Sequence, residues 1–561
     1  MDYKEYIAQK LDVNGMDKES IAAAIEVPPT NELGDFALPC FKFARVLRKS
    51  PAAIAEELKN NFVTDEVISE VSAVNGYLNF KVNRAGKTTS VIDKILSEDD
   101  NYGSSDIGKG KTVCVDYSSV NIAKPFHIGH LMTTVIGSSL CKIYRFLGYK
   151  VVGINHLGDY GTQFGKLIVA FKKWSSVEAV NEGRLKELTR IYVKFHEEAE
   201  KDTALDDEAR HYFKLIEDGD EEANELFNLF KKITLEEVGK IYEKLNVTFD
   251  SYAGESFYND KMQPIIDELE EKGLLKTSEG AKIVDLSEYN MPPCLILKAD
   301  GSSLYATRDL AAAVYRKNTY DFDKCLYVVA YQQNLHFKQF FKVLELMGKP
   351  WAKDLVHVAF GMVSLEDGAM STRKGKVVLL DDVINKTIEK AAAVIEAKNP
   401  ELENKEEVAK TVGTGAVIFG ALANNKIKDI VFSIDKVLNF DGETAPYVQY
   451  TVARCNSILS KSGVSEFSYS VPEITPSEYD LIAKLGEFPD VVKSAAEKYE
   501  PSFVTRYAVD LASLFNKFYI NCKILGAEDN VKNFRLALVK CVKTTLTNAL
   551  KLLGIGTVEK M

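Results

Sequence analysis

The chain has 561 residues, of which 46% are hydrophobic and 27% charged, and its formal net charge is -11 at pH 7. This length exceeds what one hydrophobic core accommodates, so we expect several domains, and the composition excludes long disordered or low-complexity segments. No run approaches the roughly 18 apolar residues of a membrane span, and the first residues lack the apolar core of a signal peptide, which together predict a cytoplasmic protein.

The eight cysteines lie far apart, mostly within apolar runs, and none belongs to a C-x-x-C pair. We therefore expect buried thiols rather than disulfides or a zinc site. The cysteines are Cys40, Cys114, Cys141, Cys294, Cys325, Cys455, Cys522 and Cys541.

Charge is unevenly distributed along the chain. The negative net charge argues against a nucleic-acid partner, but residues 501–561 carry nine basic and four acidic residues, a surplus of five positive charges. Many of the acids lie in residues 197–225, which we expect to form a solvated helical hairpin away from any phosphate. The basic end of the chain is either a phosphate-contacting surface or ordinary charge scatter on helices.

The first hundred residues predict a small, separate α/β unit. We expect residues 28–39 to form a turn-rich loop, and residues 50–62 predict a helix with Ser50 as N-cap and Pro51 at its first position. Residues 71–82 alternate between apolar and polar side chains, as one strand would. A charged, glycine-containing connection over residues 97–111 marks a domain boundary.

After this boundary, strands and helices alternate. Residues 112–117 predict a strand, residues 127–147 a helix and residues 149–159 a second strand. This βαβ pattern predicts a parallel sheet.

The second half of the predicted sheet is distant in sequence from the first. A mostly helical insertion from about 165 to 245 separates the halves, and strands return at residues 324–333 and 354–363, each next to a helix. Such a division is typical of an open doubly wound sheet, which binds its ligand where the strand order reverses. From Asp381 onward the residues are helical in period.

The stretch NIAKPFHIGHLMTT, residues 121–134, contains two of the seven histidines. His127 and His130 are three apart at a predicted helix start, beside unpaired backbone N–H groups and the positive end of the helix dipole. This arrangement suits a polyphosphate: the imidazoles can donate hydrogen bonds, Gly129 leaves room for a flat base, and Lys124 adds a cation. The alternative is a pair of helix-capping histidines, and the spacing alone does not separate the two.

The longer stretches VDYSSVNIAKPFHIGH, residues 115–130, and NHLGDYGTQFG, residues 155–165, resemble the HIGH region of class I aminoacyl-tRNA synthetases, in detail that of the arginine-specific family. MSTRKG, residues 370–375, resembles the family's second signature, KMSKS, although it lacks the first lysine. In that family the lysine before the HIGH motif, here Lys124, takes over charge neutralisation on ATP. Further matching segments follow in the family's order, at residues 31–39, 251–256, 305–316, 331–341 and 447–459.

The resemblance implies an α/β fold, in which a Rossmann-like doubly wound parallel-sheet catalytic domain carries a helical insertion. It implies a tRNA-contacting N-terminal α/β domain over residues 1–105 and a catalytic domain over residues 106–380. A helical connector would span residues 381–440, and an all-helical anticodon-binding domain residues 441–561. The implied activity is ligation of L-arginine to tRNA(Arg) through an arginyl adenylate, with ATP as substrate and Mg²⁺ assisting, by a monomer that needs no membrane.

Individual roles are also implied by the resemblance. Catalysis would fall to His127, His130, Lys124, Arg373 and Lys374, and ATP binding to His127, Gly129, His130, Met370, Ser371 and Lys374. L-Arginine would be held by Asn121, Glu255, Tyr305, Asp309 and Gln333. A planar guanidinium with five donors needs carboxylates and other acceptors, and a two-point Asp contact discriminates against lysine. No group of side chains has metal-ligand spacing.

These residues also have structural interpretations. Tyr305 and Asp309 could simply start a helix, Gln333 could end a strand, and Glu255 could be a surface acid. We interpret His336 as a structural histidine of an amphipathic helix and leave it outside the catalytic set. Two other functions stay open: a synthetase-like paralogue with an acceptor other than tRNA, and a non-catalytic RNA-binding or arginine-sensing protein.

Overall fold

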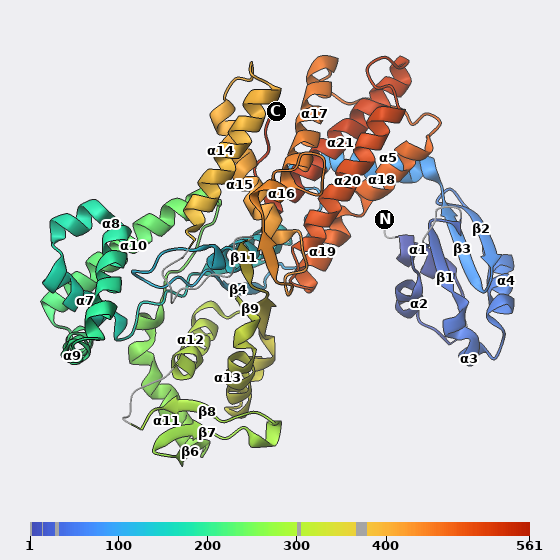
Figure 1. Ribbon diagram of the computed structural model, residues 1–561. Helices are drawn as coiled ribbons and strands as arrows, with labels where there is room; N and C mark the ends of the chain where they lie inside the picture. The colour runs from blue at the N-terminus through green and yellow to red at the C-terminus, as the bar shows by residue number, and fades with distance from the viewer. Residues whose placement is uncertain (1–2, 14, 29–32, 300–304, 366–377) are drawn as a thin grey trace. The chain divides into compact units, whose positions relative to one another are not determined.

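The computed structural model describes residues 3–13, 15–28, 33–299, 305–365 and 378–561 (Figure 1). The chain divides into two compact units. One comprises residues 1–99, 464–486 and 517–541, and the other comprises residues 100–463, 487–516 and 542–561. Each unit has a hydrophobic core of its own.

The first unit is built on a three-stranded antiparallel sheet of order β1-β3-β2, with β1 Phe36–Pro39, β2 Ile68–Val74 and β3 Tyr77–Val82. Helices α1 (Tyr3–Lys10), α2 (Lys18–Ala24) and α4 (Pro51–Asn61) contribute to its core. The predicted start of α4 is confirmed, because the Ser50 side chain accepts a hydrogen bond from the Ala53 N–H at 3.3 Å and Pro51 is the first helical residue.

The prediction of one strand over residues 71–82 is wrong, because β2 and β3 form a hairpin. Asn75 and Gly76 occupy its turn with φ of 49° and 81°, and Val74 pairs with Tyr77. Two successive left-handed residues make a tight turn whose twist matches the flanking strands. A two-residue turn keeps the apolar and polar residues in phase, so alternation alone did not reveal it.

The second unit contains a sheet of four parallel strands in the order β10-β9-β4-β5. Helix α6 (Leu131–Phe146) connects β4 to β5, and α13 (Asn334–Leu346) connects β9 to β10. The strand order therefore reverses between β4 and β9, which confirms the predicted doubly wound sheet. The strands are β4 Thr112–Asp116, β5 Lys150–Ile154, β9 Lys324–Ala330 and β10 Leu355–Phe360.

Both faces of this sheet are covered, and its strands are accordingly apolar. Val113, Cys114 and Val115 of β4 are fully buried, as are Cys325 and Leu326 of β9. All eight cysteines are buried and free, as the sequence predicted. A separate antiparallel sheet of β6 (Leu275–Ser278), β7 (Ala281–Val284) and β8 (Cys294–Leu297) packs on the same core.

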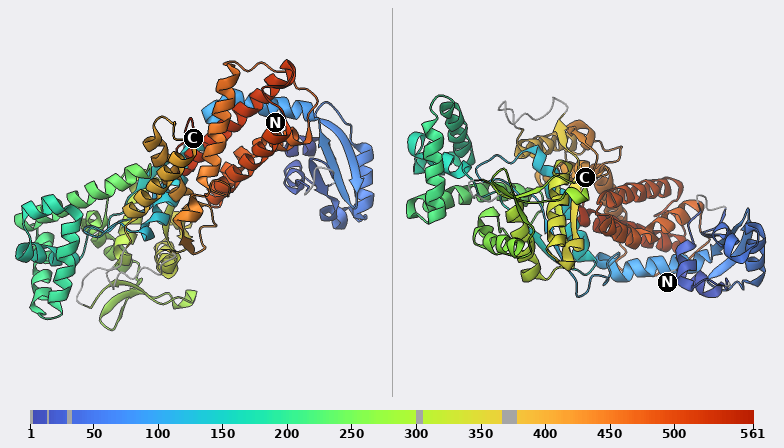
Figure 2. Two further views of the ribbon diagram at one scale, coloured as in Figure 1. Left: turned by 45° about the horizontal axis from the view of Figure 1, so that its top comes forward. Right: turned by 90° about the horizontal axis from the view of Figure 1, so that it is seen from below.

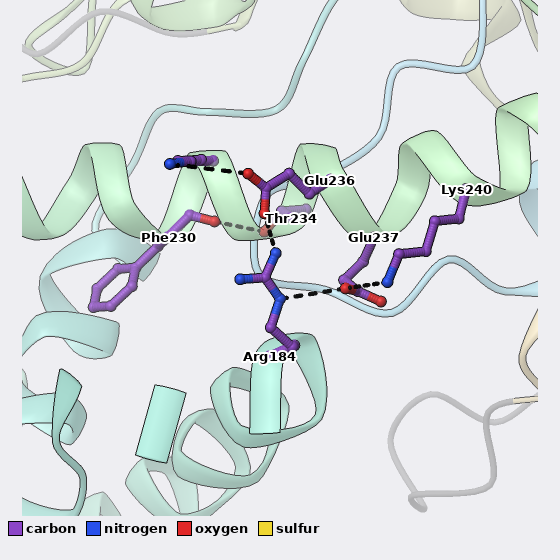
Figure 3. Close-up of polar contacts among 7 residues, drawn as sticks. Arg184, Phe230, Thr234, Glu236, Glu237 and Lys240 are labelled. Atoms are coloured by element: carbon purple, nitrogen blue, oxygen red, sulfur yellow. Dashed lines mark hydrogen bonds and ion pairs between the residues drawn. The ribbon is translucent and has the colours of Figure 1, made fainter. Parts of the chain in front are cut away.

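The predicted helical insertion is confirmed as four helices, which Figures 1 and 2 show gathered in one bundle. Helix α8 is kinked at Arg184, whose φ is 52° and ψ -137°. The Arg184 guanidinium forms ion pairs with Glu236 and Glu237 of α10, the latter at 3.3 Å (Figure 3), so the kink is held against the neighbouring helix. The helices are α7 Gln163–Trp174, α8 Val177–Ala199, α9 Ala204–Asp218 and α10 Glu221–Lys244.

Beyond residue 378 the chain is helical, apart from the short strand β12 (Ile430–Phe432), which pairs with β11 (Val363–Leu365). No helix among the residues that the structure describes is long and apolar enough to cross a bilayer. The helices are α14 Leu380–Lys398, α15 Lys405–Leu422, α16 Ile434–Val437, α17 Ala445–Ser462, α18 Pro476–Gly486, α19 Phe488–Glu497, α20 Ser502–Asn521 and α21 Asp529–Leu553.

A buried ion pair at the carboxyl end of β4 provides a test of the fold. Arg316 Nη2 lies 2.8 Å from Asp116 Oδ2, and the two side chains are 1% and 8% exposed. Replacing Arg316 by Met leaves a buried carboxylate unpaired and should lower the free energy of unfolding by about 3–5 kcal/mol. Denaturant unfolding measures the loss. Arg145→Met, which breaks an exposed pair with Asp250, should lower the free energy of unfolding by at most about 1 kcal/mol. Equal losses in the two variants would contradict the buried character of the Arg316–Asp116 pair.

Candidate active site

The loops that follow β4 and β5 run side by side at the carboxyl edge of the sheet. The Gly158 N–H donates to the Val120 carbonyl at 2.9 Å, and the Ile122 N–H donates to the Gly158 carbonyl at 3.2 Å. A Cβ on Gly158 would come within 2.2 Å of Asn121 Oδ1, so the Asn121 side chain packs directly on this glycine. The pairing places Asn121 at the carboxyl edge of the sheet, between the loops that follow β4 and β5.

The two histidines of the HIGH-like motif cap the start of the helix. Nδ1 of His127 accepts a hydrogen bond from the Gly129 N–H at 3.1 Å, and Nδ1 of His130 accepts one from the His127 N–H at 3.2 Å. With both Nδ1 atoms acting as acceptors, we assign each neutral ring the tautomer that carries its proton on Nε2. Capping by Nδ1 thus leaves Nε2–H as a donor on each ring, so the two interpretations of the motif are compatible.

The environment of these rings keeps them neutral. Burial lowers the pKa of His130 to about 3, with further lowering by His127 and Lys124. Burial, followed by the charge of Lys124, also lowers the pKa of His127. The ring of Phe126 stacks on His130 with centroids 4.9 Å apart, which helps to exclude water from it. At neutral pH the histidines are therefore hydrogen-bond donors rather than cations, and Lys124 supplies the charge beside them.

The segment after the KMSKS-like loop pairs with the histidine motif. The Ile128 N–H donates to the Val378 carbonyl at 3.1 Å, and the Leu380 N–H donates to the Phe126 carbonyl at 3.0 Å. Residues 378–380, which follow MSTRKG in the sequence, therefore lie beside His127. Met370, Ser371, Arg373 and Lys374 themselves lie outside the described residues.

An acidic group of side chains lies at the same edge of the sheet. Glu255 begins a 3₁₀ turn (Glu255–Lys261), and its N–H donates to the Leu157 carbonyl at 2.9 Å. Burial raises the pKa of Glu255 to about 7, the cation of Arg308 opposes this rise, and the charges of Asp309 and Asp159 add to it. A partly buried carboxyl near two other acids favours the approach of a cation, because a bound cation offsets both desolvation and repulsion.

Asp309 lies in the first turns of α12 (Tyr305–Tyr320) and is held by a histidine. His336 Nε2, from α13, lies 2.6 Å from Asp309 Oδ2. The interpretation of His336 as purely structural overlooked this contact. The available signal was its position three residues after Gln333 in the same matched segment, which places it on the helix that leaves the carboxyl end of β9.

The remaining predicted arginine-binding residues lie at exposed positions. Tyr305 is 69% exposed at the start of α12, one helical turn before Asp309 and on the same face. Gln333 is exposed at the end of a 3₁₀ turn (Tyr331–Gln333) that directly follows β9. Both residues are thus open to a ligand, and their roles stay predictions.

The structure indicates no protein-only metal site in the residues it describes, where no group of three or more His, Cys, Asp or Glu side chains could hold an ion.

Three family models match the chain in succession. Residues 1–82 match the "Arginyl tRNA synthetase N terminal domain", residues 91–434 match "tRNA synthetases class I (R), catalytic domain", and residues 448–561 match the "DALR anticodon binding domain".

Curated relatives and solved structures agree with these matches. The "Arginine--tRNA ligase" of Clostridioides difficile is 54% identical and that of Halothermothrix orenii 52% identical, each over the full length of both chains. The arginyl-tRNA synthetase of Thermus thermophilus superposes with a TM-score of 0.82 at 26% identity, covering 96% of each chain. That of Plasmodium falciparum superposes with a TM-score of 0.81 at 25% identity, covering 96% of this chain and 94% of its own. The chain therefore belongs to the arginyl-tRNA synthetase family of class I aminoacyl-tRNA synthetases.

Proposed function

We propose that this chain activates L-arginine with ATP and transfers it to the 3′-terminal adenosine of tRNA(Arg). The observation that carries the proposal is the presence of two opposite chemistries at the carboxyl edge of one sheet. Neutral N–H donors of His127 and His130 suit phosphoryl oxygens, and the carboxyls of Glu255 and Asp309 suit a guanidinium or an ammonium. The names of the full-length relatives support the same activity.

The first step is in-line attack of the arginine carboxylate on the α-phosphorus of ATP, with pyrophosphate as leaving group. No protein nucleophile is required, so the catalytic residues act by positioning and by offsetting phosphoryl charge. His127 and His130 donate through Nε2–H, and Lys124, Arg373 and Lys374 supply positive charge. Gly129, Met370 and Ser371 line the nucleotide, and Mg²⁺ would be held through the phosphates of ATP.

Selection of arginine depends on the acids. Asp309 receives the planar guanidinium, with Tyr305 on the same helical face, while His336 fixes the orientation of the Asp309 carboxylate. Glu255 balances a second positive group of the substrate, and Asn121 and Gln333 contact its backbone end. A site built to hydrogen-bond its substrate rejects an analogue that leaves the acceptors unused by a factor of about 10⁴–10⁵, which makes a separate editing site unnecessary.

The second step passes the arginyl group to the terminal ribose, at the 2′-hydroxyl in class I enzymes. The match of residues 448–561 to anticodon-binding domains supports anticodon contacts by residues 441–561, and the positive surplus of residues 501–561 favours phosphate binding. Residues 1–105 would contact the tRNA as well, and residues 106–380 would carry out catalysis. Residues 381–440 would connect the catalytic domain to the anticodon-binding domain. We propose that the enzyme works as a monomer in the cytoplasm.

Arginine-dependent exchange of pyrophosphate into ATP is the direct test of this function. We expect exchange to require arginine, ATP and added tRNA, and lysine to replace arginine poorly because an ammonium cannot match the two acceptors of Asp309. Radiolabelled pyrophosphate measures the rate. Exchange that needs no tRNA would favour the paralogue, and the complete absence of exchange would favour a non-catalytic protein.

Replacing His130 by Ala should lower the rate of adenylate formation by about 10²- to 10³-fold, because it removes one donor to developing phosphoryl charge. Single-turnover kinetics measure this step, and circular dichroism checks that the helix remains. His211→Ala, an exposed histidine of α9, is the matched control and should leave the rate unchanged. An unaltered rate in the His130 variant would refute the assignment.

Glu255 predicts how arginine binding depends on pH. The carboxyl has a pKa of about 7 in the free protein, and a cation binds its ionised form. As pH falls from 8 to 6, the KM for arginine should therefore rise, approaching about tenfold per unit below pH 7, whereas it should be flat above pH 8. Glu255→Gln should raise KM at pH 8 and remove the pH dependence. A KM that does not change over this range in the unaltered enzyme would show that Glu255 does not bind the substrate.

A further inference from the structure

Helix α10 of the insertion turns one row of polar side chains toward the loops of the site. Lys231, Thr234 and Tyr242 are spaced by three and eight residues, so they lie along one face of the helix. Glu236 and Glu237, on another face, hold Arg184 at the kink of α8 (Figure 3). The helix is therefore tied on one side to its own bundle and on the other to the catalytic loops.

The contact of Lys231 is with a fully buried acid. Lys231 Nζ lies 2.6 Å from Asp159 Oδ2, and the Asp159 side chain has no exposed surface. The same carboxylate accepts the Ser256 N–H at 2.9 Å and the Ser256 hydroxyl at 2.8 Å. Asp159 thus joins the insertion to the segment that carries Glu255, the residue before Ser256.

Two further residues of α10 reach neighbouring loops. Thr234 Oγ1 accepts the Ala123 N–H at 3.0 Å, and Ala123, with φ of 59°, precedes Lys124. The Tyr242 hydroxyl lies 2.8 Å from Ser118 Oγ and accepts a hydrogen bond from Asn155 Nδ2 at 3.0 Å. Loops that follow β4 and β5 are therefore held by the same helix.

Close packing shows how tightly the Asp159 contact is made. A Cβ on Gly254 would come within 2.5 Å of Asp159 Oδ1 and 2.7 Å of the Leu157 carbonyl. The segment around Glu255 therefore lies directly on Asp159, with little space to adjust. If the carboxylate lost its cation, a buried charge would be left without a counter-ion, and the segment that carries Ser256 would no longer be held against a fixed partner.

We propose that Lys231 is a positioning residue for arginine binding, which sets the place of Glu255 through Asp159 and Ser256. The inference rests on the proposed function. It gives the helical insertion a role in substrate selection. Lys231 lies on α10, 24 positions before Glu255, and determines where the Glu255 carboxyl lies.

Steady-state pyrophosphate exchange at saturating tRNA tests this role with three variants of the full-length enzyme. Lys231→Met keeps the length of the side chain and removes its charge, Lys231→Arg restores the charge, and Lys232→Met is the matched control. Lys232 is the next residue on the same helix and is 73% exposed. Its Nζ lies 4.0 Å from Glu236 Oε1, in a long and exposed ion pair. KM for arginine, KM for ATP, kcat and the melting temperature are measured for each.

We expect Lys231→Met to raise KM for arginine by about 10- to 100-fold, as displacement of a binding group by an ångström does, and to leave KM for ATP within about twofold. Lys231→Arg should recover most of the loss, and Lys232→Met should behave as the unaltered enzyme. A selective change in the arginine constant that arginine at position 231 reverses is not expected of a residue that only stabilises the fold.

Two results would overturn the inference while leaving the function intact. In one, Lys231→Met has the same constants as the unaltered enzyme. In the other, both KM values and the melting temperature change together and Lys231→Arg does not restore them, which would indicate a purely structural pair. Exchange by the unaltered enzyme that is independent of arginine would instead refute the proposed function, and the inference with it.

Discussion

The site depends on one constraint: two parallel strands lie side by side, and their connections leave in opposite directions. β4 and β9 pair directly, with Cys114 opposite Cys325. Helix α6 leads from β4 to β5 on one side, whereas α13 leads from β9 to β10 on the other. Because two helices diverge at this point, the carboxyl edge between the strands is not covered by either connection. His127 and His130 lie just before α6, and Gln333 and His336 lie at the start of α13, so the two pairs lie on the two sides of this edge.

Electrostatics divide this edge of the sheet into two parts. Around the HIGH-like motif, burial removes positive charge from the imidazoles, so the proposed interaction with a phosphoryl group is through hydrogen bonds that need no reorganisation. Around Glu255 the situation is reversed, because acids lie close together and burial makes the ionised form costly. In the proposed function, the phosphates of ATP meet the first part and the positive groups of arginine meet the second.

The helical insertion also has a place in this physical scheme. Its helix α10 provides a cation for buried Asp159 and hydrogen-bonding groups for the loops after β4 and β5. Loops at a sheet edge have few backbone partners of their own, so a rigid helix that hydrogen-bonds to several of them limits their freedom. The insertion is thus integrated into the catalytic unit rather than appended to it.

Local patterns in the sequence determined a large part of the fold: the apolar strands and periodic helices of both βαβ halves, the Ser50 cap of α4, and the HIGH-like motif at a helix start. These features depend on residues within a few positions of each other, and their physics is the same wherever the segment lies. The hairpin at Asn75 and Gly76 was also encoded locally, but its turn left the alternation undisturbed.

Only the tertiary structure decided which distant residues meet. The tautomers of His127 and His130 follow from backbone donors in the folded turn, and the raised pKa of Glu255 follows from burial beside Asp309 and Asp159. The contacts of His336 with Asp309 and of Lys231 with Asp159 span 27 and 72 residues. Periodicity specifies which face of an element is apolar, but the partner of a polar group depends on how separate elements pack, and hence on the whole chain.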